Sequence, residues 1–356
     1  MVTEPVYRSV KRLCYAGLDS VSLRTEAMAR ISRALDYDSH AFGTTDPDTG
    51  LLNHFVVRDM PTPLALAYVD RIYPWSSAQY TIDAARRGNA VFPAGAETPE
   101  LAEYQRANGL HHGVDVVCST GDRLWGKWCI LREQRGSREI AADAALLRRL
   151  VPHLSRGLQQ AALVDAATGD GAQSTTAAAV IVLDHAGRPA LRSSSAMAML
   201  ADVADIGVEF DGGVPVAVLA TALRVQRAAR EAPDGVPVTE MNRVRGRSGR
   251  WYVVQANLAE PDAAGRSSTV IVIRPLAPRE MAPVLSSLYG LSPREREIVA
   301  AVVRGDTTKE IAARLSIAPA TVKEHLDRAC AKTGARGRRE LIARLFRDIY
   351  RPAMMA

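Results

Sequence analysis

Cysteine is scarce in this chain of 356 residues, which has only four: Cys14, Cys118, Cys129 and Cys330. None of them forms a CxxC pair, and none has histidines at the spacing of a zinc site. Disulfide-stapled folds and structural zinc sites both need such groups. We therefore expect no disulfide framework and no metal site. No haem or flavin ligand set is recognisable either, so no cofactor is expected.

Long apolar runs are also lacking. No segment approaches the roughly eighteen consecutive apolar residues of a membrane-spanning helix, and residues 1–5 lack the hydrophobic stretch of a signal peptide. We expect a cytoplasmic protein without a membrane partner. No nucleophile–base pair or metal-ligand constellation stands out, so we also expect that the protein is not an enzyme.

An excess of one charge is absent from most of the chain. The sequence has 45 Lys and Arg against 39 Asp and Glu, a net charge of +6. Residues 283–356 hold 14 of the basic and 8 of the acidic side chains, which leaves 31 of each in residues 1–282. The entire excess thus lies in the C-terminal segment. Attraction to DNA phosphates requires such a basic excess, so nucleic-acid contact is expected there.

Helix signals are dense in this basic segment. Ser292 can cap a helix that begins at Pro293, and Glu295 stands three residues after the cap. Signals for three more helices follow, at 308–315, 319–333 and 338–346. Two short helices joined by a tight turn, the second of them basic, form the arrangement that places a helix in the DNA major groove.

The segment resembles the helix-turn-helix domain of LuxR-type (GerE-like) bacterial transcription regulators. The residues that carry the resemblance occur in the family order and spacing: Leu291–Glu297, Lys309–Ala312, Thr321–Leu326, Lys332–Ala335 and Arg338–Leu341. The resemblance implies an all-α four-helix domain over 283–350 that binds double-stranded promoter or operator DNA. It also implies RNA polymerase as a further partner to consider.

In the family, the helix that begins near Pro319 enters the major groove. The resemblance therefore implies that the DNA-binding residues are Thr308, Lys309, Thr321, Lys323, Glu324, His325, Lys332, Arg336 and Arg338. Ala318 departs from the pattern, because many relatives have a capping Ser or Thr there. Glu324 can read a cytosine amine or pair with Arg328, and both interpretations stay open.

Residues 1–165 combine helix and strand signals and end in a long amphipathic helix over 140–164. The stretch from Trp125 to Leu154 is similar to the GAF-like N-terminal domain of many actinobacterial LuxR-type regulators, which implies a sensor or dimerisation domain over residues 1–165. The helix can pack on its own sheet or pair with its twin in a dimer. Aromatic residues, 5% of the chain, are concentrated here and either line an effector pocket or fill a core. The ligand-binding candidates are Tyr68, Tyr73, Trp75, His112, Trp125 and Trp128.

A hairpin is the clearest strand signal of this domain. Pairing about the turn at 120–122 places Cys118 near Trp125 and Cys129 near Val114. The small polar residues 166–176 then predict a flexible linker. Residues 177–276 have a strand and helix order similar to a PAS-like domain, for which we expect dimerisation or signal relay.

Three arginines of the PAS-like segment, Arg243, Arg245 and Arg247, alternate along one strand. They indicate a solvated sheet edge rather than a contact with the DNA backbone. The predicted fold class is therefore multidomain α/β (α+β), with GAF-like, PAS-like and helix-turn-helix domains. The predicted function is a homodimeric, sequence-specific transcription regulator controlled by a small-molecule effector or partner. The alternative is a constitutive regulator whose N-terminal domains only dimerise or bind a protein partner.

Overall fold

The computed structural model describes residues 3–35, 37–61, 86–94, 112–121, 123–132, 140–167, 178–232, 236–276, 289–303 and 305–343, with positions 63, 64, 69, 81, 83, 84, 103, 105–107 and 280. The chain forms two compact units. The larger comprises Met1–Asp165 with Thr175–Pro275, and the smaller comprises Ala166–Ser174 with Leu276–Ala356. Most of the predicted linker, 168–176, lies outside the described residues.

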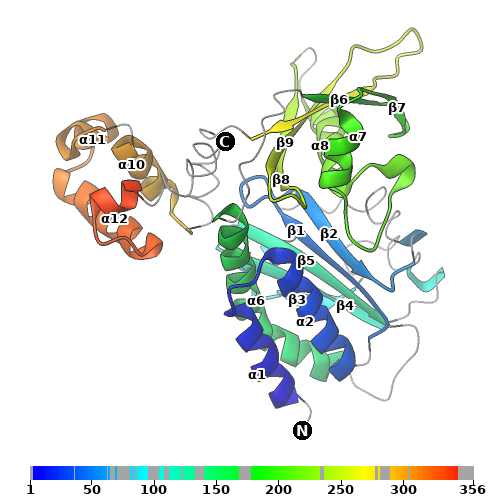
Figure 1. Ribbon diagram of the computed structural model, residues 1–356, viewed down its shortest axis with the longest axis horizontal. Helices are drawn as coiled ribbons and strands as arrows, with labels where there is room; N and C mark the ends of the chain where they lie inside the picture. The colour runs from blue at the N-terminus through cyan, green and yellow to red at the C-terminus, as the bar shows by residue number, and fades with distance from the viewer. Residues whose placement is uncertain are drawn as a thin grey trace. The chain divides into compact units, whose positions relative to one another are not determined.

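The first sheet of the larger unit has five strands in the order β2-β1-β5-β4-β3, all antiparallel. They are β1 Ser39–Thr45, β2 Leu52–Arg58, β3 Val91–Pro93, β4 His112–Thr120 and β5 Arg123–Arg132. Three helices cover one face of this sheet: α1 Thr3–Cys14, α2 Ser20–Leu35 and α6 Ile140–Ala167 (Figure 1).

The core of this layer lies between the helices and the covered face of the sheet. Phe42 of β1 and Trp128 of β5 stack there, with ring centroids 4.8 Å apart and planes 4° from parallel. The apolar stripe of α6 is also buried, including Leu147, Leu150 and Leu154. Of the two alternatives predicted for this helix, the structure shows the first: the stripe packs inside its own unit.

The predicted hairpin forms, but its register differs by one residue from the prediction. A bulge between Cys118 and Ser119 shifts the pairing of β4 with β5. Cys118 therefore lies opposite Gly126, and Cys129 lies opposite Asp115. The prediction was wrong because a bulge adds a residue to one strand without a mark in the apolar pattern.

The second sheet belongs to the same unit and has the order β7-β6-β10-β9-β8. Its strands are β6 Ala179–Leu183, β7 Pro189–Arg192, β8 Thr239–Arg245, β9 Trp251–Leu258 and β10 Thr269–Pro275. Two helices, α7 Ala196–Asp202 and α8 Val216–Glu231, and the short 3-10 turn η2 Asp211–Gly213 accompany them. Buried side chains of both helices and of the sheet form one apolar core.

The part of the larger unit that contains the second sheet, residues 178–276, joins the first sheet along its edge strand β2. Val57 N donates to Ile206 O at 2.7 Å, and Ile206 N donates to Phe55 O at 3.0 Å, so the two segments form a short parallel bridge. Gly207 follows with φ of 78°, and a Cβ at this position would lie 2.0 Å from Val57 O. An edge strand exposes unpaired backbone groups, and here part of that edge is covered.

Apolar side chains from the two regions also pack together. Leu52, Phe55 and Val57 of β2 form one buried cluster with Phe210 and with Val216 and Ala220 of α8. The two sheets are therefore parts of one compact unit.

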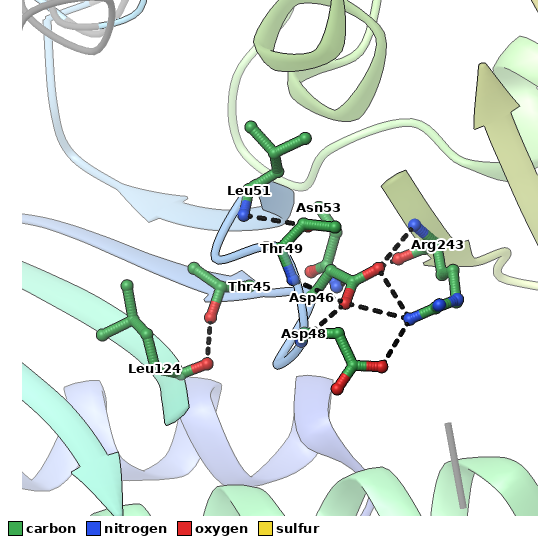
Figure 2. Close-up of polar contacts among 8 residues, drawn as sticks. All are labelled: Thr45, Asp46, Asp48, Thr49, Leu51, Asn53, Leu124 and Arg243. Atoms are coloured by element: carbon green, nitrogen blue, oxygen red, sulfur yellow. Dashed lines mark hydrogen bonds and ion pairs between the residues drawn. The ribbon is translucent and has the colours of Figure 1, made fainter. Parts of the chain in front are cut away.

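Arg243 of β8 faces two acidic side chains of the first region (Figure 2). Arg243 Nη1 lies 3.3 Å from a carboxylate oxygen of Asp46 and 2.9 Å from one of Asp48. Arg245 pairs with Asp165 at 3.3 Å, and Arg247 donates to the backbone oxygen of Asp205 at 2.7 Å. The predicted solvated edge is wrong for Arg243 and Arg245, which are half-buried and paired within the unit, whereas Arg247 is exposed.

The smaller unit contains α10 Pro293–Val303, α11 Thr308–Leu315 and α12 Pro319–Thr333, with a further helical segment at 338–343. The predicted cap of α10 is confirmed. Ser292 N donates to Glu295 Oε2 at 2.8 Å, and Glu295 N donates to Ser292 Oγ at 3.2 Å. Within the described ranges of the chain, no helix is both long and apolar enough to span a bilayer.

Candidate nucleic-acid interface

The start of α11 is fixed by a second reciprocal cap. Glu310 N donates to Thr307 Oγ1 at 3.3 Å, and Thr307 N donates to Glu310 Oε2 at 2.7 Å. The bonds from Thr307 lower the pKa of Glu310. Thr308 is half-buried and Lys309 is exposed in the first turn of α11, where the N–H groups and the helix dipole attract phosphate.

A tight turn connects α11 to α12. Ser316 ends α11 in the left-handed region, with φ of 52° and ψ of 45°. Ile317 N donates to Ala312 O at 3.0 Å, which closes the last turn of the helix. A non-glycine residue pays roughly 1 kcal/mol or more for this conformation, so the turn stores a modest strain.

The cap of α12 is weak, as predicted. Ala318 occupies the N-cap position in an extended conformation, with φ of −69° and ψ of 145°, and has no side-chain acceptor. Pro319 follows in the first turn, where its fixed φ suits a helix. Loss of a Ser or Thr cap costs about 1 kcal/mol of helix stability.

The two faces of α12 differ sharply. Buried positions hold it against the unit: Val322, Leu326, Ala329, Cys330 and Thr333. The other face is exposed and carries Lys323, Glu324, Asp327 and Arg328, while Thr321 and His325 are half-buried at its margin. The predicted core positions Ile298, Ile311, Val322 and Leu326 are buried, and Leu315 is half-buried.

Glu324 forms an ion pair with Arg328, one turn further along α12. Both side chains are more than half exposed, at 60% and 55%. An exposed pair of this kind contributes only about 0.3–0.5 kcal/mol. The pair of Glu324 with Arg328 is therefore present, yet it is weak enough to break when either side chain meets a better partner.

Lys332 lies near the end of α12 and reaches across to the start of α10. Its Nζ is 2.7 Å from Glu295 Oε2 and 3.1 Å from Gly290 O. Burial alone would raise the pKa of Glu295, but the bonds from Lys332 and Ser292 outweigh it and lower that pKa. Lys332 thus holds the end of α12 against the capping box of α10.

Arg338 is also engaged within the unit, because its Nη2 donates to Asp306 O at 2.6 Å. Arg336 has an exposed side chain, and its backbone N donates to Glu340 Oε2 at 2.9 Å. The nine predicted DNA-binding residues therefore divide into two groups. Lys332 and Arg338 stabilise the fold through bonds within the unit. The remaining seven lie in the first turn of α11, on α12 or, in the case of Arg336, just after α12.

The comparisons with known proteins agree on this unit. Residues 289–345 match the family model described as bacterial regulatory proteins, luxR family. Over 57 residues the chain is 42% identical to spore germination protein GerE of Bacillus subtilis strain 168, an alignment that covers 16% of this chain and 77% of GerE. This chain belongs to the luxR family of bacterial regulatory proteins. Its smaller unit is the DNA-binding helix-turn-helix domain of that family.

Solved structures of other luxR-type proteins are similar only at a low level. Escherichia coli SdiA aligns over 96% of this chain and 96% of its own, at 13% identity and a TM-score of 0.34. Vibrio cholerae VqmA aligns over 49% of this chain and 84% of its own, at 17% identity and a TM-score of 0.24. TM-scores this low do not support a shared overall fold. Membership of the luxR family therefore rests on the match over residues 289–345.

Within the described part of the chain, the residues predicted to bind an effector do not form one site. Trp128 is fully buried in the core beneath the helices. Trp125 is 3% exposed, and its Nε1 donates to Thr120 Oγ1 at 3.1 Å in the hairpin turn. His112 begins β4, but its side chain lies outside the described part, as do the predicted residues Tyr68, Tyr73 and Trp75.

The sequence did not predict a buried polar cluster that lies where the two sheets meet. Arg24 of α2 is fully buried and donates to Phe42 O at 2.7 Å and to His54 Nδ1 at 2.9 Å. Burial lowers the pKa of Arg24 to about 10. Burial, and then the Arg24 charge, also lower the pKa of His54 well below its usual value, so His54 is the neutral acceptor of this bond.

Asp205 completes this junction from the side of the second sheet. Its carboxylate accepts Phe55 N at 2.6 Å and Val216 N, at the start of α8, at 2.8 Å. Burial raises the pKa of Asp205 to about 6 despite these bonds and the nearby Arg24 and Arg247 charges. The only sequence signal was an arginine on the otherwise apolar face of α2, beside Leu23 and Ala27.

Proposed function

We propose that this luxR-family chain is a sequence-specific transcription regulator that inserts α12 into the DNA major groove. One observation carries the proposal. The exposed face of α12 presents Lys323 and Glu324 directly after a capped helix and a tight turn, while its other face is buried. Base edges in the major groove are read by side chains presented in this way.

The exposed residues divide into two roles under this proposal. Lys323 and Glu324 face the base edges, with Glu324 leaving Arg328 to accept from a cytosine amine. Thr308, Lys309, Thr321, His325 and Arg336 contact the DNA backbone, where the charge of the segment supplies affinity. Lys332 and Arg338 remain at the phosphate-facing rim of the proposed interface, although both are bonded within the unit.

We further propose that the regulator is a cytoplasmic homodimer, with RNA polymerase as a partner at the promoter. Residues 1–165 and 177–276 are interpreted as GAF-like and PAS-like domains of the actinobacterial arrangement, joined at 166–176. A small-molecule effector or protein partner at these domains controls access of 283–350 to DNA. The alternative is a constitutive regulator whose N-terminal domains only dimerise or bind a protein. No enzymatic step is needed in either case.

Selection of bound duplexes from a random DNA pool by the full chain tests the proposal. We expect enrichment of one motif, and a dimer predicts two symmetric half-sites about one helical turn apart. A single half-site would contradict the dimer, and recovery of the unselected pool would contradict sequence-specific binding.

The role of Glu324 has its own test on the selected site. A base-substitution scan is repeated with Glu324→Gln, which keeps the size of the side chain and removes its charge. If Glu324 accepts from a cytosine amine, the preference at one base pair should weaken by about 1–3 kcal/mol. An unchanged preference at every position would show that Glu324 serves only its ion pair with Arg328.

A further inference from the structure

An open groove is formed by side chains of α1 and α2, which pack against each other in the larger unit (Figure 1). Its volume is about 600 Å³. Half of the residues that line it are arginines. The lining residues are Glu4, Pro5, Arg8, Ser9, Arg12 and Arg30. None of them belongs to the residues predicted to bind DNA or an effector, so the groove is a separate feature of the molecule.

Two of these arginines are held in place by neighbouring groups. Arg30 Nη1 donates to Ser9 O at 2.9 Å, and its Nη2 lies 3.5 Å from Glu26 Oε2. Arg8 Nε donates to Glu4 Oε1 at 3.2 Å. A guanidinium group has five N–H donors, and these contacts use at most two of them on each arginine. Arg8 and Arg30 are therefore positioned and still have donors for a ligand.

Arg12 differs from the other two arginines. Its side chain is exposed, and it has no hydrogen-bond or ion-pair partner within the part of the chain that the structure describes. It lies one turn after Arg8 on α1, and like charges at this spacing destabilise a helix. The contacts within the unit therefore do not account for an arginine at this position.

Glu4 is the acidic residue of the groove, and it is already neutralised. Arg149 Nη2 donates to Glu4 Oε2 at 3.0 Å, opposite the bond from Arg8. The bond from Arg149 is the main cause that lowers the pKa of Glu4. Arg149 is itself held over the ring of Tyr7, 4.1 Å from its centroid. Glu4 thus forms ion pairs with two arginines and does not offset the charge of Arg12.

The charge balance of the groove selects the class of ligand. The lining residues and their ion-pair partners hold four arginines and two carboxylates, an excess of two positive charges: Arg8, Arg12, Arg30 and Arg149 against Glu4 and Glu26. A phosphate monoester carries close to two negative charges above its second pKa, and its oxygens match the guanidinium fork. A single carboxylate would leave one positive charge uncompensated.

The size and the walls of the groove favour a phosphate with an organic body. Sites of about 300–1,000 Å³ hold small organic ligands, and inorganic phosphate alone would leave most of the groove unfilled. The ring of Pro5 and the methylene stems of the arginines supply apolar surface. A nucleobase can stack on a guanidinium plane, which sugar phosphates without a base cannot do.

We infer that this groove binds a nucleotide, whose phosphate contacts Arg8, Arg12 and Arg30. The inference goes beyond the proposed function and does not depend on DNA reading by α12. Because the DNA backbone presents the same phosphate chemistry, the experiment separates a free nucleotide from DNA.

The test measures binding to the full chain by calorimetry, without magnesium and at low salt, with AMP, ADP, adenosine and inorganic phosphate. The pH lies above the second phosphate pKa of about 6. AMP should bind once per chain, and ADP more tightly because of its additional charge. Adenosine and inorganic phosphate should each bind at least about tenfold more weakly than AMP. No binding of AMP, or an equal affinity for adenosine or for inorganic phosphate, overturns the inference.

Two matched variants test the place of binding. Arg12→Gln removes a charge from the groove. Arg33→Gln removes the same charge from an exposed arginine of α2 that does not line it. Arg12→Gln should weaken AMP binding by about ten- to hundredfold, the effect of a hydrogen bond to a charged group. Arg33→Gln should weaken it by less than about threefold, because salt screens a charge outside the groove. Equal losses in the two variants overturn the assignment to this groove.

The salt dependence of DNA binding by the same two variants separates the two sources of phosphate. For a free nucleotide, both variants should keep the wild-type slope. If the groove held the DNA backbone, Arg12→Gln alone would reduce the slope by about one unit, and that result overturns the inference. Nucleotide binding is measured without DNA, so a chain that selects no DNA sequence overturns the proposed function and leaves this inference standing.

Discussion

Arg24, His54 and Asp205 are buried together where the two sheets' regions join, and their ionisation affects folding. His54 is held neutral, because burial and the Arg24 charge lower its pKa. Burial also favours the neutral, protonated form of Asp205, because it raises the pKa of this carboxyl to about 6. A carboxyl whose pKa is raised in the folded state favours folding while it is protonated.

The Asp205 pKa predicts a pH-dependent difference between wild type and Asp205→Asn. Its contribution is complete below the unfolded pKa near about 3.9, and it is lost as pH rises through about 6. Relative to the variant, which cannot ionise, the wild type should lose up to about 3 kcal/mol of unfolding free energy between those values. Denaturant unfolding of both proteins at a series of pH values measures this.

The unfolding free energy of the variant is subtracted from that of the wild type at each pH, because the ionisation of His40 and His54 changes stability in the opposite sense. Burial lowers the pKa of His40 to about 4 and that of His54 well below its usual value, so both destabilise the fold as pH falls. These effects are shared by the two proteins and cancel in the difference. A difference that stays flat across this pH range would contradict the assignment to Asp205.

At the scale of the element, α12 is held by contacts that leave its exposed face clear. Lys332 fastens its C-terminal turn to Glu295 and Gly290 O. Arg294 Nη2 donates to Leu315 O at 2.8 Å, which holds the turn before α12. Two lysines of the predicted DNA-binding set thus differ in their surroundings, since Lys309 is exposed at the start of α11 and Lys332 is bonded to a buried carboxylate.

This contrast predicts different salt dependences for Lys309→Gln and Lys332→Gln. A lysine that neutralises a phosphate contributes about one unit to the slope of log affinity against log salt. Lys309→Gln should reduce the slope by about that much. Lys332→Gln should change it by less than half as much and should instead lower the unfolding free energy by about 1–3 kcal/mol, because Glu295 is left buried without its cation. Equal slope changes in the two variants would contradict the bracing role of Lys332.

At the scale of the whole molecule, the larger unit depends on contacts between residues far apart in the chain. Arg243 and Asp46 are 197 positions apart, and Asn242 Nδ2 donates to Leu52 O at 2.7 Å across 190 positions. The bridge between Ile206 and β2 joins the same two regions. The second sheet's region is thus bound along β2, which explains why it is not a separate compact unit.

Gly207 provides a matched test of this junction. Gly207 and Gly265 have nearly the same backbone, with φ of 78° and 74°, but a Cβ at Gly207 meets Val57 O whereas none of the described atoms lies within 4 Å of one at Gly265. Each alanine substitution costs roughly 1–2 kcal/mol for the left-handed conformation. Gly207→Ala should cost several kcal/mol beyond this, measured as the free energy of unfolding. Equal losses in the two variants would mean that β2 and the Gly207 segment are not in contact.

The sequence was sufficient where the determinants are local. Ser292, Pro293, Glu295 and Gly334 mark the helix ends of the smaller unit through capping rules that act within one turn. The junction could not be predicted, because alternating arginines in β8 have the same local pattern whether water or Asp46 faces them. The buried ion pair of Asp115 in β4 with Lys127 in β5 lies between these extremes. Charges inside two apolar strands were visible, but only the shifted hairpin register shows that they share a face.

The central claim is that α12 reads DNA sequence, and the specificity ratio of the full chain tests it most directly. Affinities for the selected duplex and for a scrambled duplex are measured at one salt concentration with wild type, Lys323→Ala and the control Arg266→Ala, which removes an exposed arginine of the larger unit. Wild type and control should prefer the selected duplex by about a thousandfold or more, and Lys323→Ala should lose about 1–3 kcal/mol of that preference. A wild-type ratio near one, or a Lys323→Ala ratio equal to that of the control, would contradict the claim.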